Sequence, residues 1–462
     1  MSVYDVLVIG SGPGGYVAAL RGAQLGLSVA IAEKDPSFGG TCLNVGCIPS
    51  KALLESSELV FKAKKEFAQH GIAVSPTVDL AKMQARKDSI VSQLTKGVAG
   101  LLKKAKVEIF AGSARFVAPG KVDVNGQVVE AKNIIIATGS VPSSLPGIAF
   151  DGERIVDSTG ALAFTDVPET LVVIGAGAIG LELGSVWSRL GSKVTVLEYL
   201  PRILPGIDGE AAALALRIFA RQGMTIETGV RVRAARVEGG SVIVTADGAK
   251  DGDAPREWTC DKLLVATGRR PYTDGLDLVA AGLTTDERGR IPIDGHLRTN
   301  VPGIWAIGDV VAGPMLAHKA SEEGVAVVER IAGRAGHVNY NAIPGIVYTE
   351  PEIAGVGKSE EDLRAEGIEF KKGSFPFAPN GRAKALGAKE GFVKILTDAR
   401  TDRILGAHVI GPRAGDLIAE LVIAMEFGAS AEDIGRSIHA HPTLAEVIKE
   451  AALAAGEGAL HV

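Results

Sequence analysis

The sequence predicts an α/β protein with two Rossmann-like dinucleotide-binding domains and a C-terminal α+β domain. The first supporting observation is an internal duplication, because residues 7–33 and 172–198 align at a constant offset of 165. Each copy reads as an apolar strand, a glycine-rich turn, a helix and a second strand, which is a βαβ unit. The second observation is a change of pattern after Ile343, where strand-like segments at 346–349, 391–396 and 404–410 precede helices from Asp416.

Bulk composition supports several domains and excludes several classes of protein. A chain of 462 residues exceeds what one hydrophobic core normally serves, so about two to four domains are expected. The net charge of −5 gives no reason to expect nucleic acid or an anionic membrane as a partner. No window reaches the roughly 18 uninterrupted apolar residues of a membrane span. Residues 1–5 show no targeting segment, so a cytoplasmic protein is expected, although a mature organelle protein with its leader removed would look the same.

Changes of pattern near 148, 275 and 343 divide the chain into four parts. The expected parts are dinucleotide-binding domains at 1–148 and 149–275, a central segment at 276–342 and a C-terminal domain at 343–462. Helical periodicity predicts a long helix over Leu80–Lys104, and alternation within 232–262 predicts antiparallel strands. Apolar runs at 134–140 and 263–269 share an Ala-Thr-Gly sequence, and a third run, at 303–309, ends on an acid. Such runs are typical of buried parallel sheets.

Each copy of the duplication carries a GxGxxG motif in the context that a dinucleotide site requires. The motif follows a strand, opens a helix and precedes an acidic residue by 18 positions. Glycines let the backbone approach a pyrophosphate, and the helix N-terminus offers free N–H groups and a favourable dipole. The acid would accept hydrogen bonds from ribose hydroxyls. The predicted residues are Gly10, Gly12, Gly15 and Glu33 in the first copy, and Gly175, Gly177, Gly180 and Glu198 in the second.

Two sites in one chain imply two different dinucleotides. A bound flavin adenine dinucleotide (FAD) with a diffusible nicotinamide cofactor is the usual combination. A carboxylate at Glu198 pairs with a free 2′-hydroxyl and repels a 2′-phosphate, which predicts NAD. Arg202 lies close in the sequence and could bind a phosphate instead; the alternative interpretation is a solvated loop charge.

Two of the three cysteines, Cys42 and Cys47, lie five residues apart. In a regular helix this spacing separates the Cα atoms by roughly 8–9 Å, whereas a disulfide tolerates at most about 7 Å. If the pair is bridged, the backbone must tighten locally, and Gly46 supplies the freedom. Such a short loop adds little stability, and a thiol beside a helix N-terminus is reactive, so the pair indicates redox chemistry. Cys260 stands alone in a strand-like stretch and is expected to be buried.

The segment 39–51, GGTCLNVGCIPSK, resembles the redox-active motif of the pyridine nucleotide–disulfide oxidoreductases. The two glycine motifs, both Ala-Thr-Gly runs and the Ala-Ile-Gly-Asp sequence at 306–309 follow in that family's order, so the resemblance covers essentially the whole chain. Stretches at 315–320, 376–383 and 439–443 are similar to the branch of the family that oxidises dihydrolipoamide. Phe38, where Leu is common, and Gly355, where Trp is frequent, depart from the pattern without touching its chemistry.

This resemblance implies a role for each residue of the redox site. Cys42 would be attacked by the substrate thiolate, Cys47 would leave as the thiolate against the flavin, and hydride would pass through FAD to NAD⁺. Lys51 would pair with Glu182 beside the nicotinamide, and Asp309 would bind the ribityl chain or phosphate end of the flavin. Other positions expected to bind cofactor are Lys34, Gly40, Thr41, Ala114, Thr138, Gly139, Ser140, Val232, Gly268, Met315, Leu316, Ala317 and His318.

The family resemblance also implies an acid–base residue in the C-terminal domain. His439 and His441 are equal candidates on composition, and the resemblance selects His441, oriented by Glu446 and reaching the cysteines of the other subunit in a homodimer. Glu446 has a competing interpretation, because Thr443 and Glu446 have the spacing of a capping box.

The implied partner is a lipoyl-bearing acyltransferase or carrier protein of a multienzyme complex. The alternatives are another FAD-dependent disulfide reductase of the same fold, or an assembly subunit without catalysis. A mercuric reductase would need a C-terminal cysteine pair, and no cysteine follows Cys260. A glutathione reductase would need an NADP site without Glu198.

Overall fold

The computed structural model describes residues 3–248 and 253–461, so residues 249–252 of the predicted antiparallel region lie outside the described part. The chain divides into two compact units, and three segments of each alternate along the sequence. The first unit comprises 1–52, 81–143 and 268–338, and the second comprises 53–80, 144–267 and 339–462. The boundaries expected from the sequence stay a prediction.

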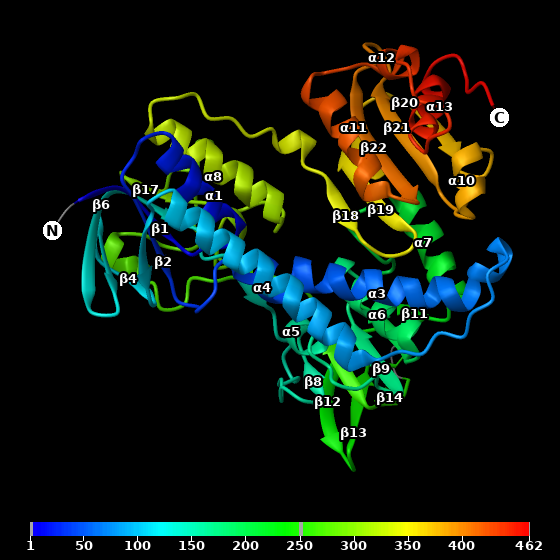
Figure 1. The fold of residues 1–462 in the computed structure, drawn as a ribbon, viewed down its shortest axis with the longest axis horizontal. Helices are drawn as coiled ribbons and strands as arrows, with labels where there is room; N and C mark the ends of the chain where they lie inside the picture. The colour runs from blue at the N-terminus through cyan, green and yellow to red at the C-terminus, as the bar shows by residue number, and fades with distance from the viewer. Residues whose placement is uncertain (1–2, 249–252, 462) are drawn as a thin grey trace. The chain divides into compact units, whose positions relative to one another are not determined.

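The first unit is built on a seven-stranded sheet (Figure 1). Its path runs β3-β2-β1-β6-β5-β4, and β17 also pairs with β6. The strands around β1 are parallel, as the apolar runs predicted, whereas β4 and β5 extend β6 as an antiparallel meander. The strands are β1 Tyr4–Ile9, β2 Val29–Glu33, β3 Glu108–Ala111, β4 Ala114–Ala118, β5 Lys121–Val124, β6 Gln127–Ile136 and β17 Ile304–Ala306.

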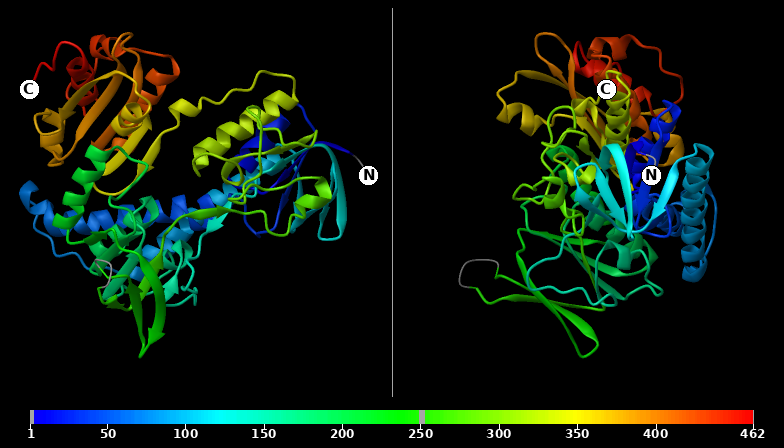
Figure 2. Two further views of the ribbon diagram at one scale, coloured as in Figure 1. Left: turned by 180° about the vertical axis from the view of Figure 1, so that it is seen from behind. Right: turned by 90° about the vertical axis from the view of Figure 1, so that its left-hand side faces the viewer.

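Both faces of this sheet are buried because alternate residues of each parallel strand enter different cores. Leu7 and Ile134 belong to one cluster, whereas Val8 and Ile135 belong to the other. On one face, α1 (Pro13–Gln24) and α8 (Ala317–Ile331) lie side by side (Figures 1 and 2). Their close approach depends on glycine, since a Cβ on Gly324 would lie 2.6 Å from the carbonyl oxygen of Gly14.

The remaining elements of the first unit are short, apart from one long helix. Helix α4, Leu80–Lys104, has the bounds that the periodicity predicted. A two-stranded ladder joins β7 (Ser140–Pro142) to β16 (Arg269–Pro271). The other segments are α2 Gly40–Val45, the start of α3 Cys47–Lys65, and the 3₁₀ turns η2 Leu278–Ala281 and η3 Gly308–Val310.

The second unit contains the second βαβ copy in a five-stranded parallel sheet ordered β11-β10-β9-β15-β8. A three-stranded antiparallel sheet, β12-β13-β14, follows it within the predicted region. The strands are β8 Ile155–Val156, β9 Thr170–Ile174, β10 Lys193–Glu198, β11 Thr225–Thr228, β12 Val232–Glu238, β13 Ser241–Ala246, β14 Arg256–Cys260 and β15 Lys262–Val265; the helices are α5 Ser158–Ala161, α6 Ala178–Leu190 and α7 Gly209–Arg221. Cys260 is buried, as predicted.

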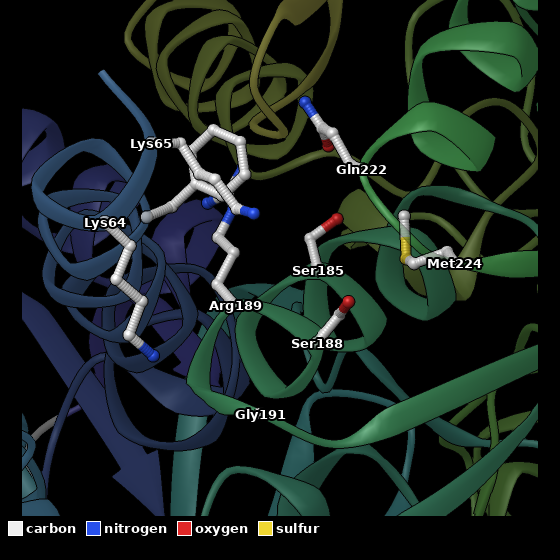
Figure 3. A pocket seen from close by; sticks show the side chains of 9 residues that line it. Lys64, Lys65, Ser185, Ser188, Arg189, Gly191, Gln222 and Met224 are labelled. Carbon is white, nitrogen blue, oxygen red and sulfur yellow. The ribbon is translucent and has the colours of Figure 1, made fainter. Parts of the chain in front are cut away.

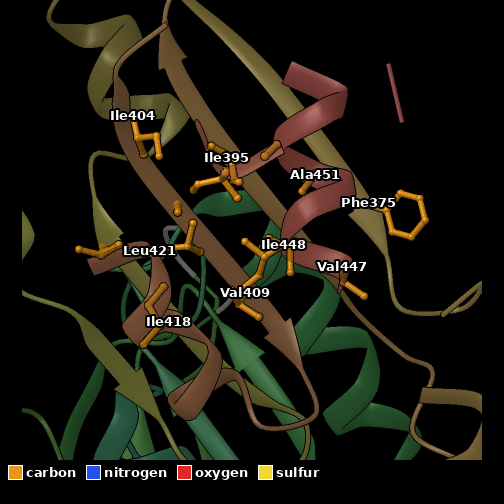
Figure 4. Packing of buried hydrophobic residues seen from close by; sticks show 14 of the residues in the cluster. Phe375, Ile395, Ile404, Val409, Ile418, Leu421, Val447, Ile448 and Ala451 are labelled. Atoms are coloured by element: carbon orange, nitrogen blue, oxygen red, sulfur yellow. The ribbon is translucent and has the colours of Figure 1, made fainter. Parts of the chain in front are cut away.

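The C-terminal part of the second unit is an antiparallel sheet covered by helices. Its order is β18-β19-β22-β21-β20, and Figure 4 shows α13 packing Val447, Ile448 and Ala451 into the core on this sheet. The elements are η4 Tyr340–Ala342, β18 Gly345–Val347, β19 Glu352–Gly357, α9 Glu360–Ala365, β20 Phe370–Pro376, α10 Gly381–Leu386, β21 Phe392–Asp398, β22 Ile404–Gly411, α11 Ala414–Glu426, α12 Ala431–Arg436 and α13 Glu446–Ala455. None of the described helices combines the length and hydropathy needed to cross a bilayer.

Candidate active site

The first glycine-rich turn joins β1 to α1, and its glycines serve two different purposes. Gly10 has φ +99°, and a Cβ there would lie 2.6 Å from the carbonyl oxygen of Ala137. A Cβ on Gly15 would lie 1.8 Å from the oxygen of Gly10, so this residue sets how closely the helix packs on the strand. Beside Gly12, in contrast, no atom of the described residues lies within 4 Å of the Cβ position once its neighbours along the chain are set aside. The start of α1 is therefore open for a phosphate group to approach the backbone.

The second turn repeats this arrangement between β9 and α6. Gly175 has φ +106°, and its Cβ would lie 2.5 Å from the carbonyl oxygen of Ala266. A Cβ on Gly180 would lie 2.0 Å from the oxygen of Gly175, and the Cβ position of Gly177 again meets no described atom within 4 Å. The duplication seen in the sequence thus extends to backbone conformation and to the open side of each turn.

Glu33 is tied to the first turn at the end of β2. Its Oε2 accepts hydrogen bonds from the backbone N–H of Ser11 at 2.8 Å and from the Ser11 hydroxyl at 2.5 Å, and its Oε1 accepts from the N–H of Asp35 at 2.9 Å. The next residue, Lys34, pairs with Asp35 at 2.9 Å and lies over the ring of Tyr272. The pair with Asp35 raises the pKa of the Lys34 ammonium.

Glu198 holds the equivalent place at the end of β10. It accepts the N–H of Ala176 at 2.7 Å and the N–H of Leu200 at 2.7 Å. Arg202 is not a free loop charge, because its Nη2 donates to the carbonyl oxygens of Pro205 and Ile207 at 2.9 and 3.0 Å. It also pairs with Glu361 at 3.4 Å. These bonds hold Arg202 to its own loop.

The cysteine pair straddles a break between two helices. Helix α2 ends at Val45, Gly46 adopts φ −138° and ψ −112°, and α3 begins at Cys47. A Cβ on Gly46 would lie 2.8 Å from the carbonyl oxygen of Thr41, so the break requires glycine. This is the local departure from helix geometry that the five-residue spacing predicted.

Cys42 and Cys47 are not joined by a disulfide in the structure. The pKa of Cys42 is raised, chiefly by its hydrogen bond with Cys47 and by burial, while the charge of Lys51 acts to lower it. Cys47 is exposed, whereas Cys42 is half-buried. Gly40 and Thr41, which were also predicted to bind cofactor, are the first two residues of helix α2.

Asp309 lies in a fixed polar group at η3. Its Oδ2 accepts the Ser140 hydroxyl at 2.5 Å, and the Arg269 guanidinium donates to both the hydroxyl and the carbonyl oxygen of Ser140 at 2.7 and 2.6 Å. The preceding residue, Gly308, is held by the buried ion pair of Lys319 and Glu323. The Lys319 ammonium donates to the carbonyl oxygen of Gly308 at 3.0 Å, and the backbone N–H of Gly308 donates to Glu323 at 2.7 Å.

Several other predicted positions have a defined place. Thr138 donates to the carbonyl oxygen of Tyr272 at 2.5 Å, and Gly139 and Gly268 have φ values of +75° and +125°. Glu182 is buried in α6, where its Oε1 accepts the N–H of Tyr348 at 3.0 Å. Ala114 and Val232 begin strands β4 and β12, and residues 315–318 form the approach to α8 and its first turn. The expected pair between Lys51 and Glu182 stays a prediction.

His441 and Glu446 form a hydrogen-bonded pair in the C-terminal domain. Nδ1 of His441 lies 2.9 Å from Oε1 of Glu446, while the imidazole side chain is 78% exposed. The pKa of Glu446 is lowered by the N–H of Thr443 and by His441, against the effect of burial. An ionised carboxylate at Nδ1 favours the tautomer that leaves Nε2 free to accept a proton.

The predicted capping box is wrong in one half. The Thr443 hydroxyl donates to the carbonyl oxygen of Ala440 at 2.7 Å, and α13 begins only at Glu446. The other half exists, since Oε2 of Glu446 accepts the N–H of Thr443 at 2.8 Å. The two roles weighed for Glu446 therefore do not compete, because each uses its own oxygen.

His439 has a different environment. Its Nε2 lies 2.8 Å from Oε1 of Glu420, its Nδ1 lies 3.1 Å from the carbonyl oxygen of Ser437, and its side chain is 6% exposed. With both nitrogens engaged and the ring buried, His439 is structural in this arrangement. His441, whose side chain is exposed and whose Nε2 meets no hydrogen-bond partner among the residues that the structure describes, is the better acid–base candidate.

Two family models match consecutive parts of the chain. Residues 4–324 match the model for pyridine nucleotide-disulphide oxidoreductases, and residues 343–452 match the dimerisation domain of the same group. The chain belongs to the pyridine nucleotide-disulphide oxidoreductase family. Its antiparallel C-terminal sheet is the family's dimerisation domain, which supports a homodimer.

Curated members of this family are similar over the full length. Dihydrolipoyl dehydrogenase 3 of Pseudomonas putida is 52% identical over 98% of each chain, and dihydrolipoyl dehydrogenase 1, mitochondrial, of Arabidopsis thaliana is 51% identical over 99% of this chain and 91% of its own. Leghemoglobin reductase of Vigna unguiculata is 53% identical over 97% of this chain and 87% of its own.

Solved family structures confirm the fold. LpdA from Mycobacterium tuberculosis superposes with a TM-score of 0.90 at 27% identity, covering 98% of this chain and 99% of that one. The HOCl-induced flavoprotein disulfide reductase RclA of Escherichia coli, as its Cu(II) complex, gives a TM-score of 0.86 at 28% identity over 98% of this chain and 99% of that one. The family is one of FAD-containing enzymes, so a flavin is implied.

Four supporting residues of this family site were missed by sequence reasoning. Ser11, Arg269 and the Lys319–Glu323 pair hold Glu33, Ser140 and Gly308 respectively. For Ser11 a signal existed, since a hydroxyl directly after the first glycine of the motif can reach the acid at the end of the second strand. For Lys319 the signal was a basic and an acidic residue four positions apart on one helix.

Proposed function

We propose that the protein is a dihydrolipoyl dehydrogenase that uses FAD and NAD⁺. The observation that carries this proposal is the pair of thiols across the helix break at Gly46, in a chain about half identical throughout its length to curated dihydrolipoyl dehydrogenases. A helix break fits reversible formation of a bond that a continuous helix would prevent.

The residues around the first turn fit FAD. The open side of Gly12 would take the pyrophosphate, Glu33 the ribose, and the group of Ser140 and Asp309 the polar chain of the flavin. When bound, the flavin supplies a two-electron relay between a dithiol and a nicotinamide. By the same argument the open side of Gly177 and Glu198 would bind NAD⁺, and Glu198 would select it over NADP⁺.

The thiols would carry the substrate's electrons. A substrate thiolate attacks the Cys42 sulfur of the oxidised pair, and the Cys42–Cys47 bond breaks with its electrons leaving on Cys47. The second thiol of the substrate then attacks the first substrate sulfur, which is bonded to Cys42 in the mixed disulfide. This step forms the cyclic product disulfide and releases Cys42. The hydrogen bond between the two thiols, which raises the pKa of Cys42, supports exchange between these neighbouring sulfur atoms.

His441 would remove the proton from the first substrate thiol. Glu446 fixes the tautomer, and exposure leaves Nε2 accessible to a substrate. We propose that His441 acts at the redox pair of the other subunit of the homodimer. The lipoyl group would be presented by an acyltransferase or carrier protein of a multienzyme complex. A cytoplasmic location stays a prediction, because the relatives include bacterial and mitochondrial proteins.

A substrate panel tests the reaction. The kcat/KM for dihydrolipoamide with NAD⁺ should be at least about 100-fold higher than the value for glutathione or a quinone as substrate. It should exceed the value for dihydrolipoamide with NADP⁺ by the same factor. Preference for glutathione would assign the chain to another disulfide reductase activity of the same fold.

Mixed dimers test the shared site. Cys42→Ser and His441→Gln should each be nearly inactive, since loss of a general base alone costs about 10² to 10⁴ in rate. After subunit exchange, one mixed dimer holds one intact site, so activity should return. Demonstrated exchange without recovery would show that the site lies within one subunit or that His441 is not the base.

A further inference from the structure

A small cavity in the second unit lies at the C-terminal end of α6, at the far end of that helix from the glycine turn. Its volume is about 170 Å³, and it lies between α6, the end of α3 and the segment that joins α7 to β11, which contributes Gln222 and Met224 (Figure 3). Each charged side chain that lines it is cationic, namely Lys64, Lys65 and Arg189, and no acidic side chain of the described residues is in the lining.

Arg189 is the decisive residue. It is only 8% exposed, and neither Nη1 nor Nη2 has a hydrogen-bond partner in the described part of the chain. Burial lowers the pKa of its guanidinium, whereas the charges of Glu58, Glu350 and Glu66 act to raise it. A buried arginine with an unused fork of donors is costly, and such a fork matches two oxygens of an oxyanion.

The neighbouring hydroxyls fit the same ligand. Ser185, Ser188 and Arg189 lie at positions i, i+3 and i+4 of α6, so they share one face of the helix. The Ser185 hydroxyl is buried and, like the Arg189 fork, lacks a partner among the described residues. Figure 3 shows Arg189 extending toward Lys65, with Ser185 and Ser188 on successive turns beside it.

Capping of helix ends does not account for Arg189. The lysines in the last turn of α3 interact favourably with the negative, C-terminal end of that helix dipole. The terminal nitrogens of Arg189, however, reach none of the described backbone carbonyls. The cavity is also too small for a dinucleotide, because sites for larger ligands occupy roughly 300–1,000 Å³.

We propose that this cavity binds a phosphate group, supplied as inorganic phosphate or as a small phosphate monoester. Arg189 would bind two of its oxygens, and the Ser185 hydroxyl a third, while Lys64 and Lys65 would balance its charge. The ligand would thereby connect α3 to α6 and stabilise the second unit. Nothing in the proposed reaction requires this site.

The test uses the FAD-loaded enzyme saturated with NAD⁺, so that both dinucleotide sites are filled. At constant ionic strength, equilibrium dialysis with labelled inorganic phosphate should find one phosphate per chain. At about 100 times Kd, phosphate should raise the thermal midpoint by roughly 3–6 °C. Glycerol phosphate in place of phosphate distinguishes the sources, because tighter binding would identify a monoester and weaker binding the inorganic ion. An equal rise with chloride or acetate would overturn the proposal.

Variants localise the effect. Arg189→Met should abolish phosphate binding and leave stability without phosphate equal or higher, because an unpaired buried charge is removed. Ser185→Ala should weaken binding roughly 3- to 10-fold, and it guards against a folding defect in the first variant. The matched control is Arg236→Met, on an exposed side chain of β12, which should respond like the wild type. Unchanged phosphate binding in Arg189→Met and Ser185→Ala would overturn the proposal.

Discussion

The two βαβ units, residues 7–33 and 172–198, have the same backbone arrangement but contact different neighbouring segments. Each unit is called a frame below. In both, the acid at the end of the second strand binds the N–H of the residue after the first glycine, at 2.8 Å for Glu33 and 2.7 Å for Glu198. In the first unit that residue is Ser11, and in the second it is Ala176.

The serine extends the first frame toward the redox helix. Gly39, which precedes α2, donates its N–H to the carbonyl oxygen of Ser11 at 2.9 Å and to the hydroxyl at 3.3 Å. Ala176 instead accepts the N–H of Leu204 from the loop that Arg202 braces. The backbone carbonyl at this position therefore joins each turn to a different segment, and in the first turn the Ser11 hydroxyl adds a second bond to Gly39. This difference suits a resident cofactor in one frame and an exchanging cofactor in the other.

The largest effects should come from filling the contact between helix and strand. Gly15→Ala and Gly180→Ala each place a Cβ within about 2 Å of a carbonyl oxygen, so the helix must shift. Overpacking of this kind costs about 1–3 kcal/mol or more. Gly15→Ala should lose bound flavin, whereas Gly180→Ala should keep it and lose NAD⁺-dependent turnover. Absorbance per chain and kinetics measure the two. Loss of flavin in both variants would show that the frames are not separate.

Removing the thiols should affect one frame only. Cys42→Ser and Cys47→Ser should lower dihydrolipoamide oxidation by about 10³-fold or more, because no other pair of described thiols is adjacent. Reduction of ferricyanide by NADH bypasses the disulfide and should change by less than about threefold. A parallel loss of the ferricyanide reaction would mean that the cysteines also support nicotinamide binding.

Exchanging the acids should separate the cofactors. Glu198→Ala removes the group that repels a 2′-phosphate, so the preference for NAD⁺ over NADP⁺ should narrow by about 10- to 100-fold in kcat/KM. Glu33→Ala should leave that ratio unchanged and weaken flavin retention. If the wild type used both nicotinamide cofactors equally, the argument from Glu198 would fail.

The smallest effect should come from the residue that distinguishes the frames. Ser11→Ala removes a buried hydrogen bond to Glu33, which should cost about 1 kcal/mol of stability and speed flavin release several-fold. The converse change, Ala176→Ser, should leave NAD⁺ kinetics near those of the wild type. Denaturant unfolding and flavin release rates provide the comparison, and equal flavin retention in Ser11→Ala would remove the role given to the hydroxyl.

Local patterns in the sequence predicted much of this fold. The repeated glycine spacing gave both βαβ units, and unbroken periodicity gave Leu80–Lys104 with correct bounds. The cysteine spacing required a break in helix geometry, and the break lies at Gly46.

Features that depend on distant partners were not predictable. Lys394 is buried among Asp208 and Glu210 at the start of α7 and Glu360 in α9, at 2.6, 3.1 and 2.8 Å, and both elements are remote from it in the sequence. The cavity at Arg189 likewise needs helices separated by more than a hundred residues. The predicted cap at Thr443 failed because its hydroxyl found a nearer acceptor in Ala440, which spacing alone does not reveal.

Helix α3 contains both one of the two redox cysteines and the division between the two units. It begins at Cys47, and the division between the units falls after Ala52, inside the helix rather than in a loop. Because each unit is assembled from three separate stretches of chain, neither can be obtained by a single cut. A nascent chain cannot complete its first unit until residues near 338 have been made. Secure flavin binding should therefore arrive late in synthesis, and the cysteines would spend most of translation as ordinary, unprotected thiols.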